Sequence, residues 1–280
     1  MKQRIITALI LAPLAVLAIF ELSFPYFLLV LAAVTVIGFW EWAQFTGSKS
    51  RYLAMIPTLI AFAVSYIVIP SDIMSMNIVA TEHLFMLVIA TIWWIVASGL
   101  AITYPRSTVT WEDSKLSRQL FGMLTLIPFF WSIVLLRAQD ISANPYYGGK
   151  LVLFVCLIVW AADSGAYFAG KSFGKRKMAP KVSPNKTIEG LLGGIVTAFI
   201  VGLGANHFFE LSFSSTGTMM LIMAVTVVIS VLGDLVESMF KRVAGIKDSS
   251  NIIPGHGGML DRIDSLTAAF PVFTLLYFTL

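Results

Sequence analysis

The chain has 280 residues, of which 58% are hydrophobic and only 12% are charged. A soluble globular protein carries about 25% charged residues. So few charges cannot cover a water-facing surface, which excludes a soluble enzyme, a disordered chain and a coiled coil and indicates an integral membrane protein. The single cysteine, Cys156, lies in an apolar stretch, which excludes a disulfide framework and a cysteine metal site.

Nine apolar stretches are candidates for membrane-spanning helices, each of which needs about 20 residues. The first follows a basic N-terminal segment, as in a signal peptide, but no convincing cleavage site comes after it, so we interpret it as a span. The sequence thus predicts an all-α, polytopic membrane protein. Its expected spans are 5–20, 24–42, 52–70, 83–104, 120–136, 151–170, 188–209, 218–239 and 263–280.

The distribution of lysine and arginine supports this number of spans and predicts the orientation. Alternate connecting segments, beginning with the N-terminal one, hold 17 of the 19 basic residues, and Arg137 and Lys150 lie in the others. Because cytoplasmic loops are enriched in lysine and arginine, we expect the N-terminus in the cytoplasm and the C-terminus outside. In a bacterium this corresponds to the cytoplasmic (inner) membrane.

The two halves of the chain differ in where they carry charge. Residues 1–150 are expected to form a transmembrane scaffold of about five spans. Within it Glu41 lies at a predicted span end, and we interpret its side chain as reaching the membrane interface. Residues 151–280 are expected to form the catalytic region, about four spans with cytoplasmic loops at 171–187 and 240–262. The segment 163–264 holds 18 of the 34 charges.

Six carboxylates lie at the predicted cytoplasmic ends of four consecutive spans: Asp163, Glu189, Asp234, Glu237, Asp261 and Asp264. Helical spacing places two sets each on one face, namely Asp234, Glu237, Ser238 and Lys241, and Asp261, Asp264 and Ser265. Paired carboxylates on two helices match the oxygen ligands of a hard cation such as magnesium. The alternative is a set of structural salt bridges to Lys241, Arg242 and Arg262, which is costly between apolar flanks.

Two loops between these spans are suited to phosphate. Loop 171–187 holds six basic residues, although cytoplasmic loops are basic for topological reasons alone. Its end, Ser183-Pro-Asn-Lys-Thr187, places a hydroxyl, an amide and an amine before a predicted helix N-terminus, where backbone N–H groups favour anions. The second loop, Pro254-Gly-His-Gly-Gly258, allows close approach of the backbone to a phosphate, with a simple tight turn as the alternative.

A longer pattern joins these features. Residues 238–264 read Ser-Met-Phe-Lys-Arg, then after four residues Lys247-Asp248, Ser250, Ile253-Pro254, His256-Gly-Gly258 and Asp261-Arg-Ile-Asp264. This pattern resembles, without departure, the C-terminal motif of the phosphatidate cytidylyltransferase (CDP-diacylglycerol synthase) family. The stretches that begin at Asp163 and Ser183 are also similar to family features, and the length fits the bacterial form. The resemblance covers about residues 163–264.

The resemblance implies an enzyme that transfers the cytidylyl group of CTP to phosphatidate, giving CDP-diacylglycerol and pyrophosphate for phospholipid biosynthesis. It implies Mg²⁺ as cofactor, with a second cation left open. The partners are these two substrates and membrane lipids, with no nucleic acid and with a homodimer left open. The active site is expected to face the cytoplasm.

The same resemblance implies the roles of the site residues. The catalytic residues are Asp234, Lys241, Asp261 and Asp264, and the three aspartates are also the metal ligands. The substrate-binding residues are Asn185, Lys186, Arg242, Lys247, Gly255, His256, Gly257, Gly258 and Arg262. The supporting residues are Asp163, Lys171, Ser183, Glu189, Glu237, Ser238 and Asp248.

Two other functions stay open at this point. A CTP-dependent lipid-alcohol kinase would release CDP instead of pyrophosphate, but the fully matched pattern at 238–264 favours the cytidylyltransferase. A transporter or channel also uses carboxylates and broken helices within the membrane. Here, however, the charges gather at one membrane face, and the sequence contains no inverted repeat.

Overall fold

The computed structural model describes residues 2–69 and 79–280, and in this part of the chain it contains nine α-helices, two short 3-10 helices and one β-hairpin. The α-helices are α1 (Lys2–Glu21), α2 (Phe24–Trp42), α3 (Arg51–Val68), α4 (Thr81–Ile102), α5 (Lys115–Arg137), α6 (Tyr147–Phe173), α7 (Ile188–Phe209), α8 (Thr216–Val243) and α9 (Leu260–Thr279). The 3-10 helices are η1 (Ala43–Thr46) and η2 (Arg106–Thr110). The antiparallel hairpin consists of β1 (Lys177–Ala179) and β2 (Ser183–Thr187).

The predicted all-α membrane fold is confirmed. Seven helices of the described chain, α2 to α8, are long and apolar enough to cross a membrane. The first and ninth expected spans fall on α1 and α9, which are not among these seven. The number of nine spans and the orientation therefore stay predictions. The expected span 52–70 ends outside the described residues.

Hydroxyl side chains begin several of the helices. Ser50, Ser114, Thr187 and Ser215 each accept a hydrogen bond from a backbone N–H of the first turn of α3, α5, α7 and α8. Such caps satisfy N–H groups that have no partner within the helix. The cap at Thr187 also ends β2, so the hairpin passes directly into α7.

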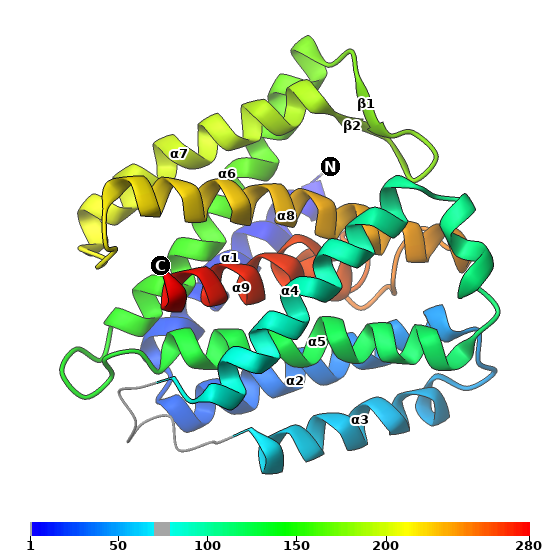
Figure 1. The fold of residues 1–280 in the computed structure, drawn as a ribbon, viewed down its shortest axis with the longest axis horizontal. Helices are drawn as coiled ribbons and strands as arrows, with labels where there is room; N and C mark the ends of the chain where they lie inside the picture. Colours follow the sequence, from blue (N-terminus) through cyan, green and yellow to red (C-terminus); the bar gives the residue numbers. More distant parts are fainter. Residues whose placement is uncertain (1, 70–78) are drawn as a thin grey trace.

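Helices from both halves of the chain pack into one apolar core, which includes Phe39 and Leu126 as well as Phe154 and Phe270. α8 lies against α9, and both contact α4 (Figure 1). The division of the chain near residue 150 into a scaffold and a catalytic region stays a prediction.

The connecting segments gather at two ends of the molecule (Figure 1). Segments 43–50, 103–114, 174–187 and 244–259 lie toward the right of the view, whereas 138–146, 210–215 and the C-terminus lie toward the left. Hydrogen bonds hold the first group in place: Gln44 donates to the carbonyl of Ser249 and so joins two of the segments, and Arg242 of α8 donates from Nε to Val182 O at 3.2 Å. The loops predicted to be cytoplasmic therefore lie together.

Candidate active site

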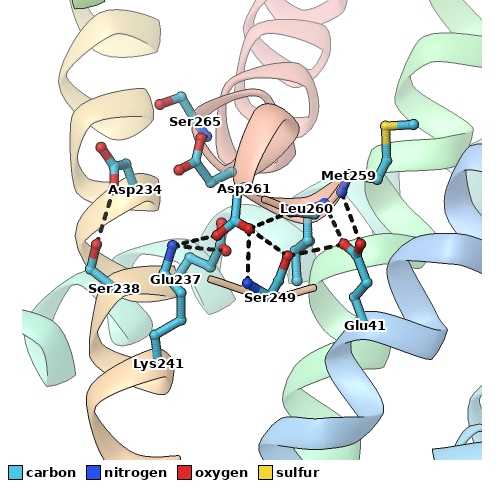
Figure 2. Close-up of polar contacts among 12 residues, drawn as sticks. Glu41, Asp234, Glu237, Ser238, Lys241, Ser249, Met259, Leu260, Asp261 and Ser265 are labelled. Atoms are coloured by element: carbon cyan, nitrogen blue, oxygen red, sulfur yellow. Dashed lines mark hydrogen bonds and ion pairs between the residues drawn. The ribbon is translucent and has the colours of Figure 1, made fainter. Parts of the chain in front are cut away.

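Asp261, in the charged first turn of α9, is the centre of a buried polar network (Figure 2). Its Oδ1 accepts a hydrogen bond from Lys241 Nζ at 2.8 Å. Its Oδ2 accepts from the backbone N–H and the hydroxyl of Ser249, both at 2.8 Å, and from the N–H of Gly258 at 2.7 Å. The network thus joins α8, the loop after it and α9.

These contacts decide the charge of Asp261. Burial by itself raises the pKa of this carboxyl, because it disfavours the ionised form. The hydrogen bond and positive charge of Lys241, together with the hydrogen bonds from Gly258 and Ser249, outweigh burial, so the pKa lies below its usual value. Asp261 is therefore ionised at neutral pH.

Lys241 is shared by two carboxylates. Besides Asp261, its Nζ lies 3.2 Å from Glu237 Oε1, one helical turn earlier on α8. The side chains of Lys241 and Glu237 are only 13% and 5% exposed. Within the described chain, neither oxygen of Glu237 accepts a hydrogen bond, so the charge of Lys241 is what compensates this buried carboxylate.

A second group of charges lines a cavity of about 280 Å³ between α6, α7, the hairpin and α8. Lys186 Nζ lies 2.7 Å from Asp234 Oδ2 and donates to Val231 O at 2.9 Å. Asp234 Oδ1 accepts from Ser238 Oγ at 3.2 Å. The cavity is lined by Asp163, Ala166, Tyr167, Met178, Asn185, Lys186, Thr187, Gly190, Leu191, Val231 and Asp234.

The two groups adjoin along α8. Figure 2 shows Asp234, Glu237 and Lys241 in succession on this helix, beside the start of α9. The half-buried Asp264 follows Asp261 by about one helical turn on α9 and accepts from the N–H of Ser265 at 2.7 Å. The structure thus brings together five of the six predicted carboxylates.

Glu189 is the sixth, and it is used differently. Its Oε2 accepts hydrogen bonds from the backbone N–H groups of Lys175 at 2.9 Å and Arg176 at 3.1 Å. It therefore holds the turn by which the chain enters the hairpin. The reason is its position in the first turn of α7, next to the turn that precedes β1.

The glycine-rich loop, for which the sequence left close approach to a phosphate and a simple tight turn open, uses two of its backbone N–H groups within the protein. Gly258 donates to Asp261, and the N–H of His256 donates to Ile253 O at 2.9 Å. Gly257 has a φ of +83°, and a Cβ there would lie 2.7 Å from Asp261 Oδ2. The loop therefore wraps around the Asp261 carboxylate, and these two N–H groups are occupied by the protein itself.

The other predicted residues lie around these two groups. Lys171 Nζ lies 5.8 Å above the ring of Tyr167, and Ser183 is half-buried in β2. Arg242 binds the hairpin through Val182, as described above. Four further residues are exposed: Lys247, Asp248 and Gly255 in segment 244–259, and Arg262 in the first turn of α9.

Glu41 was not predicted as part of the site, and its interpretation as an interfacial side chain is wrong. It lies on α2, is 0% exposed, and accepts hydrogen bonds from Ser249, Ser250, Met259 and Leu260. These partners are 208 to 219 positions away in the sequence, so no local spacing could reveal them. The one available signal was a carboxylate between two tryptophans at the end of an apolar helix.

Carboxylates and lysines gathered at one end of a polytopic helical protein form a site for an enzyme that acts on phosphate groups.

Residues 2–280 match the family model described as the Cytidylyltransferase family. The chain is 45% identical to the phosphatidate cytidylyltransferase of Haemophilus influenzae, over 99% of both chains. It is 42% identical to that of Pseudomonas aeruginosa, over 99% of this chain and 96% of the relative. It is 32% identical to that of Bacillus subtilis, over 100% and 97%. The chain therefore belongs to the phosphatidate cytidylyltransferase family and is a nucleotidyltransferase.

Proposed function

We propose that this protein transfers the cytidylyl group of CTP to phosphatidate in a metal-dependent reaction, giving CDP-diacylglycerol and pyrophosphate. The activity named for the relatives supports the reaction. The observation that carries it is the 280 Å³ cavity, where Lys186 and Asp234 lie beside the exposed ring of Tyr167. A cation next to an apolar surface suits the headgroup of an anionic lipid.

The proposed step is an in-line displacement. A phosphate oxygen of phosphatidate attacks the α-phosphorus of CTP and forms a new P–O bond. The bond from the α-phosphorus to the oxygen that bridges to the β-phosphorus breaks, and pyrophosphate leaves with that electron pair. The attacking phosphate monoester is already an anion near neutral pH, so the step needs no strong general base. Lys186 and Lys241 would neutralise phosphate oxygens as charge moves.

Asp234, Asp261 and Asp264 would hold Mg²⁺, which supplies charge neutralisation at the triphosphate and the leaving group. The position of Asp163 and Asp234 in the lining of one cavity supports this, because carboxylate oxygens that converge suit a hard cation. Among the described residues, no three acidic, histidine or cysteine side chains already form a metal-binding group. In this structure Asp261 Oδ1 is bound by Lys241.

The proposed location is the inner membrane of a bacterium, with the site facing the cytoplasm. The connecting segments rich in lysine and arginine gather at the end of the molecule that carries the site, which supports this orientation. CTP is a cytoplasmic substrate and phosphatidate a membrane lipid, so a site at this interface reaches both.

The decisive test is incubation of the purified, detergent-solubilised protein with labelled CTP, phosphatidate and Mg²⁺. We expect labelled CDP-diacylglycerol and free pyrophosphate. Release of CDP with a phosphorylated lipid would instead identify a kinase, and solute flux in proteoliposomes without CTP turnover would identify a transporter. Chelation of divalent cations should stop the reaction, and turnover that persists without them would contradict the metal requirement.

A single substitution tests the site within this assay. Asp261→Asn keeps the size of the side chain but removes its charge, so we expect loss of cytidylyl transfer. Circular dichroism and gel filtration should show a folded protein. Full activity of this variant would contradict the proposed role of Asp261.

A further inference from the structure

Glu41 connects the second helix of the chain to the loop that holds Asp261 (Figure 2). Its Oε1 accepts from Ser250 Oγ at 2.5 Å and from the N–H of Met259 at 2.9 Å. Its Oε2 accepts from Ser249 Oγ at 3.1 Å and from the N–H of Leu260 at 2.6 Å. All four donors lie between residues 249 and 260, so one side chain of α2 holds both ends of this segment.

Among the residues that the structure describes, Glu41 is held by hydrogen bonds and not by an ion pair. Within the described chain, no lysine, arginine or histidine forms an ion pair with it. Two of its four donors are instead backbone N–H groups at the start of α9, where the helix dipole is positive. Hydrogen bonds to a carboxylate at such a position are strong and direction-dependent. The position of the first turn of α9 is therefore tied to that of Glu41.

Ser249 links Glu41 to Asp261. Its hydroxyl lies 3.1 Å from Glu41 Oε2 and 2.8 Å from Asp261 Oδ2. A hydroxyl has a single proton to donate, so the two carboxylates share this donor, while the N–H of Ser249 stays on Asp261. Any displacement of Glu41 therefore changes how Asp261, and through it Lys241, is held.

The end of α2 is held rigidly enough to act in this way. The ring of Trp42 packs against Phe240 of α8 at a centroid distance of 4.9 Å, and Trp42 Nε1 donates to Arg118 O at 2.8 Å. Gln44, in η1, donates a further hydrogen bond to the carbonyl of Ser249. The anchor thus consists of Glu41 on a helix end that is itself fixed to α5 and α8.

We propose that Glu41 is a positioning residue of the nucleotidyl transfer: through Ser249 and the first turn of α9 it sets the position of the Asp261 carboxylate. The proposal rests on the proposed function for its kinetic consequence but not for the anchoring itself. Groups that orient a reactive or metal-binding carboxylate lower activity by about tenfold to a hundredfold when removed.

The experiment compares wild type, Glu41→Gln, Ser249→Ala and the double variant, purified in detergent. Each single substitution should lower kcat for CDP-diacylglycerol formation by about tenfold or more, with the KM for phosphatidate unchanged. The kcat of the double variant should be no lower than that of the less active single variant, because both substitutions interrupt the same connection. Wild-type kcat in a folded Glu41→Gln, or losses that multiply in the double variant, would overturn the proposal.

A matched control separates positioning from general destabilisation. Thr35 is also fully buried on α2, but its hydroxyl donates only to Leu31 O of the same helix, at 2.9 Å. Thr35→Ala should lower the melting temperature and leave kcat per folded molecule unchanged. A loss of kcat in this control equal to that of Glu41→Gln would assign the effect to stability.

Hydrogen–deuterium exchange tests the anchor independently of catalysis. In Glu41→Gln, the amides of residues 249–260 should exchange faster, whereas in Thr35→Ala they should not. Unchanged exchange in Glu41→Gln would overturn the anchoring, whatever the enzyme assay shows. A wild-type protein that makes no CDP-diacylglycerol would refute the proposed function alone. If Glu41→Gln does not fold, Ser249→Ala with wild-type melting and wild-type kcat overturns the proposal.

Discussion

Gly258 lies between two carboxylates, those of Asp261 and Glu41. Its N–H binds Asp261, and the space in front of its Cα is filled by the Ser249 hydroxyl and the Glu41 carboxylate. A side chain at this position would have to displace one of them. The residue therefore serves close packing of charged groups, in addition to any approach of a substrate.

Gly258→Ala should consequently damage both stability and activity. The added Cβ would lie 2.7 Å from Glu41 Cδ, and such overpacking costs about 1–3 kcal/mol. Thermal unfolding and the cytidylyl transfer assay measure the two effects. Gly99→Ala is the control, because nothing lies within 4 Å of a Cβ there and alanine favours a helix over glycine by up to about 1 kcal/mol.

Asp261 should make stability depend on acid pH. Since its pKa is lowered by folding, its contribution is fully present above the unfolded value of about 3.9 and is lost as the pH falls through the lower, folded pKa. The melting temperature of wild type should fall over this acid range, and Asp261→Asn should lack this part of the decrease. Asp113→Asn, the same change at an exposed position, is the control for the substitution itself.

Individual site residues were predictable to the extent that they were close in the sequence. The spacing of Asp234, Glu237 and Lys241 correctly placed them on one face of α8. The partners of Glu41 were not predictable, because they depend on how the second and ninth helices meet. The use of the Gly258 N–H was missed for a related reason: the sequence shows that the loop exposes donors, but not which acceptor reaches them first.

The pair of α6 and α7 is the element that shapes the cavity. The two helices approach closely at small residues: a Cβ on Gly193 would overlap Ala169, and one on Gly165 would overlap Thr197. Close approach of helices at small residues is a common way of packing in membranes, where apolar side chains gain little from contact with each other. It brings Asp163 of α6 and the β2–α7 junction to the same cavity.

Gly193→Val should therefore separate the two helices and distort the cavity. We expect a loss of stability of about 1–3 kcal/mol and a fall in cytidylyl transfer. Gly204→Val, on the same helix, is the matched control, because nothing lies within 4 Å of its Cβ position. Equal effects of the two substitutions on melting temperature and activity would show that the close approach has no special role.

Hydropathy predicted the positions of the α-helices with small errors, but it did not predict the short elements between them. The expected spans 24–42 and 188–209 have the same bounds as α2 and α7. The β-hairpin and the 3-10 helices were not predicted, because they are short and polar and depend on contacts with neighbours. An example is Ile188, whose N–H donates to Arg176 O across the hairpin at 2.9 Å.

At the scale of the whole molecule, the connecting segments divide between two ends, and this division makes the orientation testable. Cys156 is buried and is the single cysteine of the sequence, so Cys156→Ala provides a background without thiols. Into it, one cysteine can be placed at Ala143, exposed in segment 138–146, or at Lys181, exposed in the hairpin turn.

A membrane-impermeant maleimide should label Ala143→Cys in intact spheroplasts, and Lys181→Cys only after the membrane is permeabilised. This result follows if the segments rich in lysine and arginine face the cytoplasm. The reverse labelling pattern would overturn the orientation and place the site on the opposite side. Labelling of both positions in intact cells would contradict the division of the segments between two membrane faces.

The contact between Glu41 and the start of α9 also affects the order in which the site forms during synthesis of the chain. Its partners are synthesised more than 200 residues after it, so Glu41 enters the membrane region long before the donors that neutralise it exist. A nascent chain that ends before α9 leaves this carboxylate unsatisfied, a state costly in an apolar environment. Synthesis and packing of α9 therefore complete these contacts and remove the free-energy cost of the unsatisfied carboxylate. The polar contacts of this site therefore form only after residues 249–260 have been synthesised.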